Sequence, residues 1–169
     1  RIDAPGMITF GFTYPTIEWK INPDNDVYTT KANWEGKYSP SSTTNIKVHG
    51  TAVHHPVVRA DGHCYDMTID EGGILEVEAG KTLTVHGNAT IPSTGKLILG
   101  QNAKIYFMRD VEANEAIVEA EPGSEVRISG TANQSVKLDS CYSIVFEGGS
   151  AGRKNTFTKT LVTDVKVLG

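Results

Sequence analysis

The residues that decide the fold run from Gly73 to Val85, GILEVEAGKTLTV, and a second stretch, 95–107, reads GKLILGQNAKIYF. The second stretch begins 22 residues after the first, and apolar residues fall at matching positions in both. In each stretch these residues alternate with polar ones, as in a β-strand that has one inward and one outward face. The aligned apolar pairs are Leu75 and Leu97, Val77 and Leu99, Leu83 and Ile105, and Val85 and Phe107.

A repeat of this length is typical of one coil of a parallel β-helix, in which coils stack and apolar side chains form columns. Turn residues such as Ala79-Gly80 and Pro122-Gly123 separate the short strands, and these two pairs lie 43 residues apart, close to two repeats. The best helix candidate, 111–119, is short. We therefore predict an all-β fold, a parallel β-helix or solenoid with coils of about 22 residues. A β-sandwich whose hairpins resemble one another is the alternative.

The N-terminal third of the chain lacks this repeat, and the ends of a solenoid need to be covered. We therefore expect residues 1–58 to form an irregular N-terminal β region or cap, and residues 59–169 to form the β-solenoid segment. Because the chain begins with Arg1 and ends in a strand-like run, we interpret it as a fragment of a larger protein. The other domains of that parent protein are then its expected partners.

Composition argues against two classes of function. Lys and Arg total 16 against 20 Asp and Glu, which gives a formal net charge of −4, and the basic residues form no cluster. A nucleic-acid binder would carry a basic face that neutralises phosphates, so we expect no nucleic-acid partner. No apolar run approaches the roughly 20 residues needed to cross a bilayer, so we expect no membrane span.

Three aromatic residues are candidates for ligand contact, because exposed Trp and Tyr rings stack on sugars and anchor interfaces. They are Trp34, Tyr38 and Tyr65. Packing inside the cap is the alternative role for Trp34. Asp24 and Asp26, in the run NPDND, supply enough oxygen atoms for a calcium ion, although the run lacks the spacing of an EF-hand. We expect no other cofactor.

No motif for catalysis stands out. The sequence contains no nucleophile elbow of the form G-x-S-x-G, and its five histidines match no zinc-site spacing, so we interpret them as surface residues. The solenoid geometry predicts that Cys64 and Cys141 are unpaired and buried, because about 3.5 coils separate them. A secreted location would instead favour a disulfide, so the two arguments conflict.

Several pieces of the chain resemble a repeat family common in secreted surface proteins of Bacteroidota. The pieces are Ala32-Asn33-Trp34, Cys64–Ile69 (CYDMTI) and, most strongly, Gly72–Asn88 (GGILEVEAGKTLTVHGN). Modules of this family look like pectin-lyase-like, right-handed β-helices and occur in adhesin-like proteins, many of them exported by the type IX route. The resemblance implies a secreted or cell-surface location, and it implies no reaction.

We therefore expect a non-catalytic structural or adhesive module of a bacterial surface protein. It would act as a spacer, or as a surface that binds a glycan or another protein such as a surface or secretion-system protein. One alternative is a polysaccharide lyase or hydrolase, in which carboxylates and a basic residue such as Arg109 converge in one groove. Another is a fragment of a phage tail spike, which would be an obligate trimer.

Overall fold

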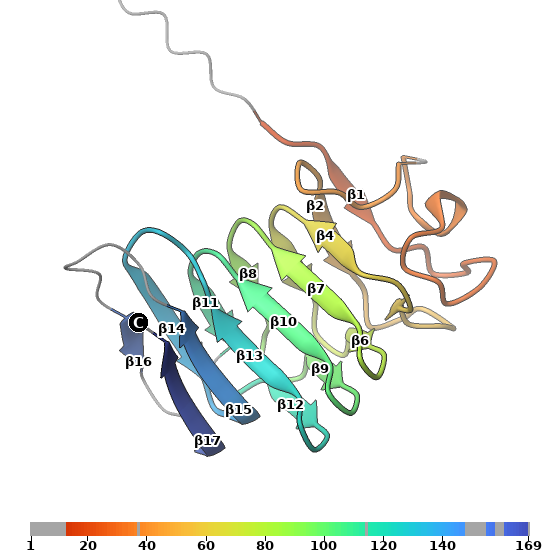
Figure 1. The fold of residues 1–169 in the computed structure, drawn as a ribbon. Coiled ribbons are helices and arrows are strands. Elements are labelled where there is room, and N and C mark those ends of the chain that lie inside the picture. Colours follow the sequence, from red (N-terminus) through yellow and green to blue (C-terminus); the bar gives the residue numbers. More distant parts are fainter. Residues whose placement is uncertain (1–12, 37, 114, 148–154, 158–160, 169) are drawn as a thin grey trace, which may run out of the picture.

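The chain forms a β-solenoid, in which short strands stack in three sheets around one core (Figure 1). The structure is a computed structural model and describes residues 13–36, 38–113, 115–147, 155–157 and 161–168. Every pairing between the named strands is parallel. The predicted all-β parallel solenoid is therefore confirmed, and the alternative β-sandwich is wrong.

The central coils contribute one strand to each sheet, and within the described residues the sheets have seven, six and four strands. The seven-stranded sheet has the order β1 (Thr16–Glu18), β2 (Asn45–Val48), β5 (Met67–Ile69), β8 (Ala89–Thr90), β11 (Val111–Ala113), β14 (Gln134–Leu138) and β16 (Asn155–Phe157). The six-stranded sheet has the order β17 (Leu161–Leu168), β15 (Ser140–Glu147), β13 (Glu125–Ile128), β10 (Lys104–Phe107), β7 (Thr82–Val85) and β4 (Gly62–Cys64). The four-stranded sheet has the order β12 (Ile117–Ala120), β9 (Lys96–Leu99), β6 (Ile74–Val77) and β3 (Val57–Val58).

The register between neighbouring coils is the one that the sequence repeat predicts. Leu75 pairs with Leu97 between β6 and β9, and Leu83 pairs with Ile105 between β7 and β10. Along β4, β7, β10 and β13 the offset between paired residues alternates between 21 and 22. The predicted coil length of about 22 residues is therefore confirmed.

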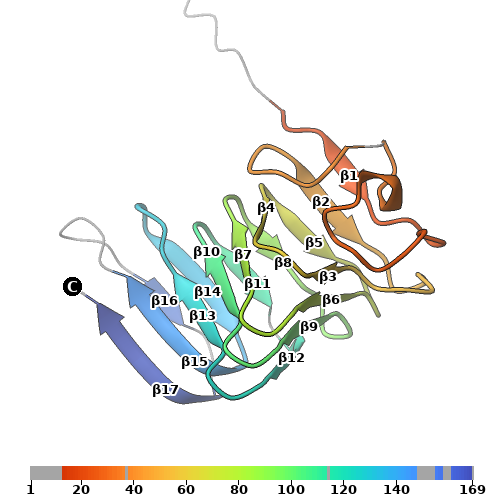
Figure 2. The ribbon, with the colours of Figure 1, turned by 45° about the vertical axis from the view of Figure 1, so that its right-hand side comes forward.

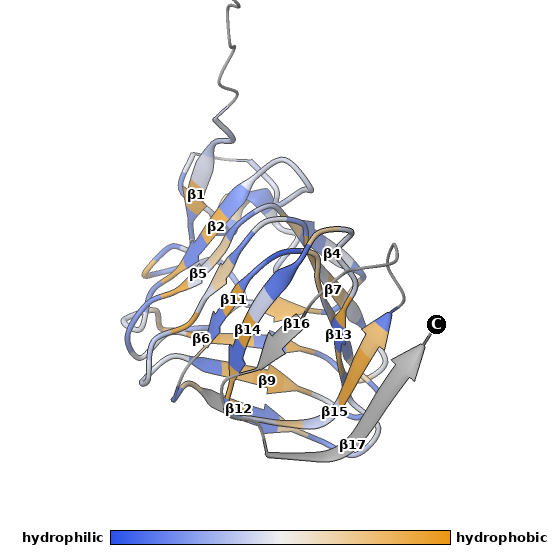
Figure 3. Ribbon diagram, turned by 90° about the vertical axis from the view of Figure 1, so that its left-hand side faces the viewer, coloured by the Kyte–Doolittle hydropathy of each residue, from blue (hydrophilic) through white to orange (hydrophobic). Residues whose placement is uncertain are grey.

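The inward positions of these strands form the core. In β6, β7, β9 and β10 every second residue is buried, and the residues between them are partly exposed. Apolar and polar segments alternate along the chain in the view of Figure 3. Since one coil has no second layer of its own, each apolar side chain is buried by its equivalents in the coils above and below.

The described residues of 111–119, the best helix candidate in the sequence, form strands, in agreement with the predicted all-β fold. This segment forms β11 and the start of β12, with a corner between them at which Glu115 adopts a positive φ of 63°. Val111 and Ala113 are buried while Glu112 is exposed, which is the two-residue period of a strand. Pairing of β11 with both β8 and β14 overrides the helix preference of the Glu and Ala residues.

The last coils differ from the earlier ones. β15 and β17 are eight residues long, and the offset between β13 and β15 falls to 18, as Ile128 pairs with Phe146. β15 contacts β12 as well as β13, so one continuous strand takes the place of two strands and the turn that joined them. In the earlier coils that turn contains a residue with positive φ, such as Gly80, Asn102 or Gly123.

An irregular segment between β1 and β2, which includes the short 3-10 turn η1 (Lys31–Asn33), closes the N-terminal end of the stack (Figure 2). Trp19, Tyr28 and Trp34 in this segment are fully buried. The ring of Trp34 meets the other two nearly at right angles, with centroid distances of 5.0 and 5.5 Å. Such edge-to-face contacts are favourable beyond the area they bury.

Each polar ring atom of these three residues has a partner. The indole nitrogen of Trp34 donates to the backbone oxygen of Tyr28 at 2.7 Å, and the Tyr28 hydroxyl donates to that of His63 at 3.0 Å. The indole nitrogen of Trp19 donates to the backbone oxygen of His54 at 2.7 Å. The cap therefore adds aromatic packing at the first coil without leaving these buried polar groups unsatisfied.

The parallel ladder begins earlier than the predicted solenoid segment. β1 pairs with β2, β2 with β5, and β3 with β6, so three strands of the range 1–58 belong to the solenoid sheets. The predicted boundary between residues 58 and 59 consequently falls inside a coil, between β3 and β4. The irregular part of that range is the stretch between β1 and β2.

Both cysteines are unpaired and buried, as the solenoid geometry predicts. Cys64 lies in β4 and Cys141 in β15, which are four strands apart in the six-stranded sheet. At about 4.8 Å per strand this separation is roughly 19 Å, far beyond the reach of a disulfide. Burial raises the pKa of each thiol to about 12.

Candidate functional site

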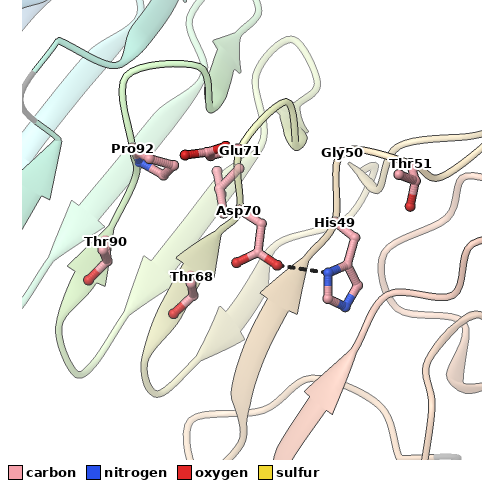
Figure 4. A pocket seen from close by; sticks show the side chains of 9 residues that line it. His49, Gly50, Thr51, Thr68, Asp70, Glu71, Thr90 and Pro92 are labelled. Atoms are coloured by element: carbon pink, nitrogen blue, oxygen red, sulfur yellow. Dashed lines mark hydrogen bonds and ion pairs between the residues drawn. The ribbon is translucent and has the colours of Figure 1, made fainter.

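Among the described residues, three depressions lie on the outer face of the seven-stranded sheet, and they share lining residues and therefore form one continuous surface. We call this surface the outer groove. The first depression, about 540 Å³ in volume, lies at the ends of β2, β5 and β8 (Figure 4) and is lined by His49, Gly50, Thr51, Thr68, Ile69, Asp70, Glu71, Thr90 and Pro92. The second, about 470 Å³, is lined by Tyr65, Asp66, Gly87, Asn88, Met108, Arg109, Asp110, Ala132 and Asn133. The third, about 270 Å³, is lined by Asn88, Ala89, Thr90, Asp110, Val111, Glu112, Ser135 and Lys137.

The third depression connects the other two. It shares Thr90 with the first, and it shares Asn88 and Asp110 with the second. The groove thus crosses the sheet from the corner before β5, β8 and β11 to the corner after β5 and β8.

The hollow arises from the size of the outward side chains. One row of paired outward positions runs across neighbouring strands through Lys47, Thr68, Thr90, Glu112 and Lys137. Two short threonines occupy its middle, and long charged residues occupy its ends. Because the threonine side chains do not reach as far from the sheet as their neighbours, the centre of the row is lower than its ends.

A charged network borders the groove next to the cap. His49 follows β2, and its Nδ1 lies 2.8 Å from a carboxylate oxygen of Asp70, while its Nε2 lies 2.9 Å from one of Glu18 (Figure 4 shows the Asp70 contact). Lys47 lies 3.2 Å from the same Asp70 oxygen. A carboxylate only accepts hydrogen bonds, so both ring nitrogens of His49 donate when the imidazole is protonated. The network ties together β1, β2 and the turn after β5.

The opposite corner of the groove is built from a ladder of Asn and Asp side chains. The side-chain oxygen of Asn45 accepts from the backbone nitrogen of Asp66 at 3.2 Å, and that of Asp66 accepts from the backbone nitrogen of Asn88 at 2.7 Å. Two coils after Asp66, the side-chain oxygen of Asp110 likewise accepts from the backbone nitrogen of Ser135 at 2.8 Å. Each side chain therefore bonds to the backbone of the following coil, where it satisfies an N–H that the sheet ladder does not use.

Arg109 supplies the positive charge of this corner. The Asp66 and Asp110 carboxylates of the same depression already accept backbone N–H groups. Within the part of the chain that the structure describes, the guanidinium of Arg109 makes no hydrogen bond or ion pair, so its donors are open to a ligand. Glu112 and Lys137, by contrast, pair with each other at 2.7 Å.

The three predicted aromatic contact residues lie in different surroundings. Trp34 is buried in the cap, which is the packing role weighed for it, whereas Tyr38 is 62% exposed. Tyr65 is partly buried, lines the second depression and contacts the tilted ring of Tyr14, with a centroid distance of 4.2 Å and an interplanar angle of 49°. Of the three, only Tyr65 lines the outer groove.

The predicted calcium residues lie in the cap. A carboxylate oxygen of Asp26 is 2.5 Å from Arg59, and this guanidinium lowers the pKa of Asp26. The backbone nitrogen of Asp24 donates to the side chain of Asn33 at 3.0 Å, so this buried amide organises the loop. Within the described ranges, no group of three or more His, Cys, Asp or Glu residues is placed to hold a metal ion.

The outer groove itself was not identified from the sequence, because its residues come from coils about 21 or 22 positions apart. The signal for it was nevertheless present. The same register that aligns the inward residues also aligns the outward row of Lys47, Thr68 and Thr90.

No helix in the described part of the chain is long and apolar enough to cross a membrane.

Comparison with known proteins adds one match. Neither the curated proteins nor the solved structures include a match to this chain. A family described as a domain of unknown function matches residues 18–128, a range that includes the cap and the coils through β13. The chain therefore belongs to the DUF8693 family.

Proposed function

We propose that this chain is a non-catalytic structural and adhesive module of a secreted or cell-surface bacterial protein, and that its outer groove binds a glycan. Its relation to the Bacteroidota surface-protein repeats and their type IX export is part of the same proposal. On this view the solenoid acts as a spacer that presents the groove at a distance from the other domains of its parent protein.

The continuity of the three depressions is the observation that carries this proposal. Hydroxyl, amide and guanidinium groups from neighbouring coils line one surface, among them Thr68, Thr90, Asn88 and Arg109. These groups match the dense hydroxyl pattern of a sugar chain, and the partly buried Tyr65 ring adds an apolar face beside them. A groove that crosses several strands suits an extended ligand better than a small compact one.

A glycan array and titration calorimetry test the proposal. We expect the chain to bind at least one glycan, and we expect Arg109→Ala and Thr90→Arg to weaken that binding tenfold or more. The second change places a long charged side chain at the low centre of the outward row. Lys104→Ala is the matched control, because Lys104 is an outward residue of the six-stranded sheet, away from the groove. Absence of glycan binding, or an equal loss in the control, would contradict the proposal.

One observation favours a second candidate, a polysaccharide lyase. Asp66, Arg109 and Asp110 line the same depression, which is the convergence of carboxylates and a basic residue that such an enzyme needs. Both carboxylates are bonded to backbone N–H groups, which favours a structural role for them. Incubation with acidic polysaccharides decides the question, because a lyase releases unsaturated products that absorb ultraviolet light. We expect no such products.

A further inference from the structure

Two histidines from neighbouring coils lie side by side on the outer face of the six-stranded sheet. His63 is the middle residue of β4 and pairs with Thr84, and His86 lies two residues beyond Thr84, directly after β7. Residues two apart along a strand face the same side, so both imidazoles project from the same surface. Their ring centroids are 5.4 Å apart, and the planes are inclined at 39°.

The two rings present a nitrogen atom to each other. Nδ1 of His63 and Nε2 of His86 are 3.3 Å apart, at the long end of an ordinary N–H hydrogen-bond distance. Two nitrogen ligands at 2.0–2.1 Å from a tetrahedral zinc ion are about 3.3–3.4 Å apart. The nitrogen spacing in the protein already equals that of a bound pair.

The electrostatic surroundings favour the form of imidazole that binds metal. Burial and the neighbouring His63 lower the pKa of His86, which keeps its ring neutral at lower pH than an isolated histidine. A neutral ring retains the lone pair that a metal ion needs. Neither histidine has a carboxylate partner among the described residues, unlike His49 and His55, which contact Asp70 and Glu76.

We propose that His63 and His86 together bind a divalent transition-metal ion such as Zn²⁺ or Cu²⁺. Imidazole nitrogen suits these ions, and a site with two protein ligands leaves their remaining coordination positions to water or to a donor group on another molecule. The site lies on a different sheet from the outer groove and does not depend on the proposed glycan binding.

Titration calorimetry of the full chain with ZnCl₂ and with CuCl₂ tests the proposal, with the protein purified without a histidine tag. We expect one ion per chain, with Cu²⁺ bound more tightly than Zn²⁺. His63→Ala and His86→Ala should each weaken binding at least tenfold, and the double variant should abolish it. His54→Ala, which removes an exposed histidine outside the pair, should bind as the unchanged chain does.

A second measurement needs no variant. Added Co²⁺, which is paramagnetic, should broaden the NMR signals of the His63 and His86 imidazoles before those of the other histidines. Absence of binding, binding that survives in the double variant, or broadening that begins at other histidines would each overturn the proposal.

Discussion

Truncation of one core leucine tests whether the inward columns hold the coils together. Leu97, in β9, is fully buried and pairs with Leu75 of β6 on one side and Val118 of β12 on the other. In Leu97→Ala the chain loses the transfer free energy of the removed carbon atoms and gains a cavity. The coils on both sides keep this cavity from collapsing fully. We therefore expect the free energy of unfolding to fall by about 3 kcal/mol, within the roughly 2–5 kcal/mol typical of such changes.

The next residue along the chain supplies a matched control. Ile98 belongs to the same strand but faces outward and is partly exposed, so Ile98→Ala should cost below about 1 kcal/mol. Thermal unfolding followed by circular dichroism compares the two, and the Leu97 variant should melt about 6–12 °C lower than the unchanged chain. Because Leu75 and Leu97 are in register, the double alanine variant should be less destabilised than the sum of the two single variants. Equal losses for Leu97→Ala and Ile98→Ala would refute the inward column.

Three further changes probe the cap, the thiols and the spacing between coils. Trp34→Ala should lower the free energy of unfolding by about 3–5 kcal/mol in a urea titration, whereas Tyr38→Ala, at an exposed ring, should change it little. In the folded chain the pKa of the Cys64 thiol is raised from its ordinary value of 9.0 to about 12. The unfolded chain therefore loses this proton at lower pH than the folded chain, and stability should fall as the pH rises from 9 towards 12. This loss approaches about 1.4 kcal/mol per pH unit for that thiol, and Cys64→Val should remove it from a series of melts at increasing pH. Gly50→Ala should destabilise the chain by about 1–3 kcal/mol in the same melts, because a Cβ atom there would lie 2.3 Å from the backbone oxygen of Glu71, and an unchanged melting temperature would refute that contact.

The solenoid was predictable because one local pattern carried two signals. The two-residue period placed Leu75 and Leu97 on inward faces, and the 22-residue offset between them gave the register in which β6 and β9 pair. The first signal is local to one strand, and the second links equivalent positions of neighbouring coils. The segment 111–119 is a weak helix candidate because its Glu and Ala residues favour a helix locally, while the pairing that makes it a strand comes from other coils.

The surroundings of individual side chains were not predictable in this way. Trp34 and Tyr38 are four positions apart and both aromatic, yet one is fully buried and the other is 62% exposed. The difference arises from where the cap folds back on the first coil, and the irregular segment has no period that would reveal it. The contact of His49 with Glu18 likewise joins residues 31 positions apart.

The alternation that builds the core also separates stability from binding. Inward residues such as Leu83 and Ile105 hold one coil to the next. The outward residues that alternate with them along each strand are partly exposed to solvent. A change on the outer row, for example at Thr90, alters the shape of the groove without opening a cavity in the core. Because coils repeat, the same inward pattern can support many outward rows, so a solenoid of this kind can change its ligand while it keeps its fold. Function in this chain therefore has to be sought in the rows that the sequence repeat leaves free to vary.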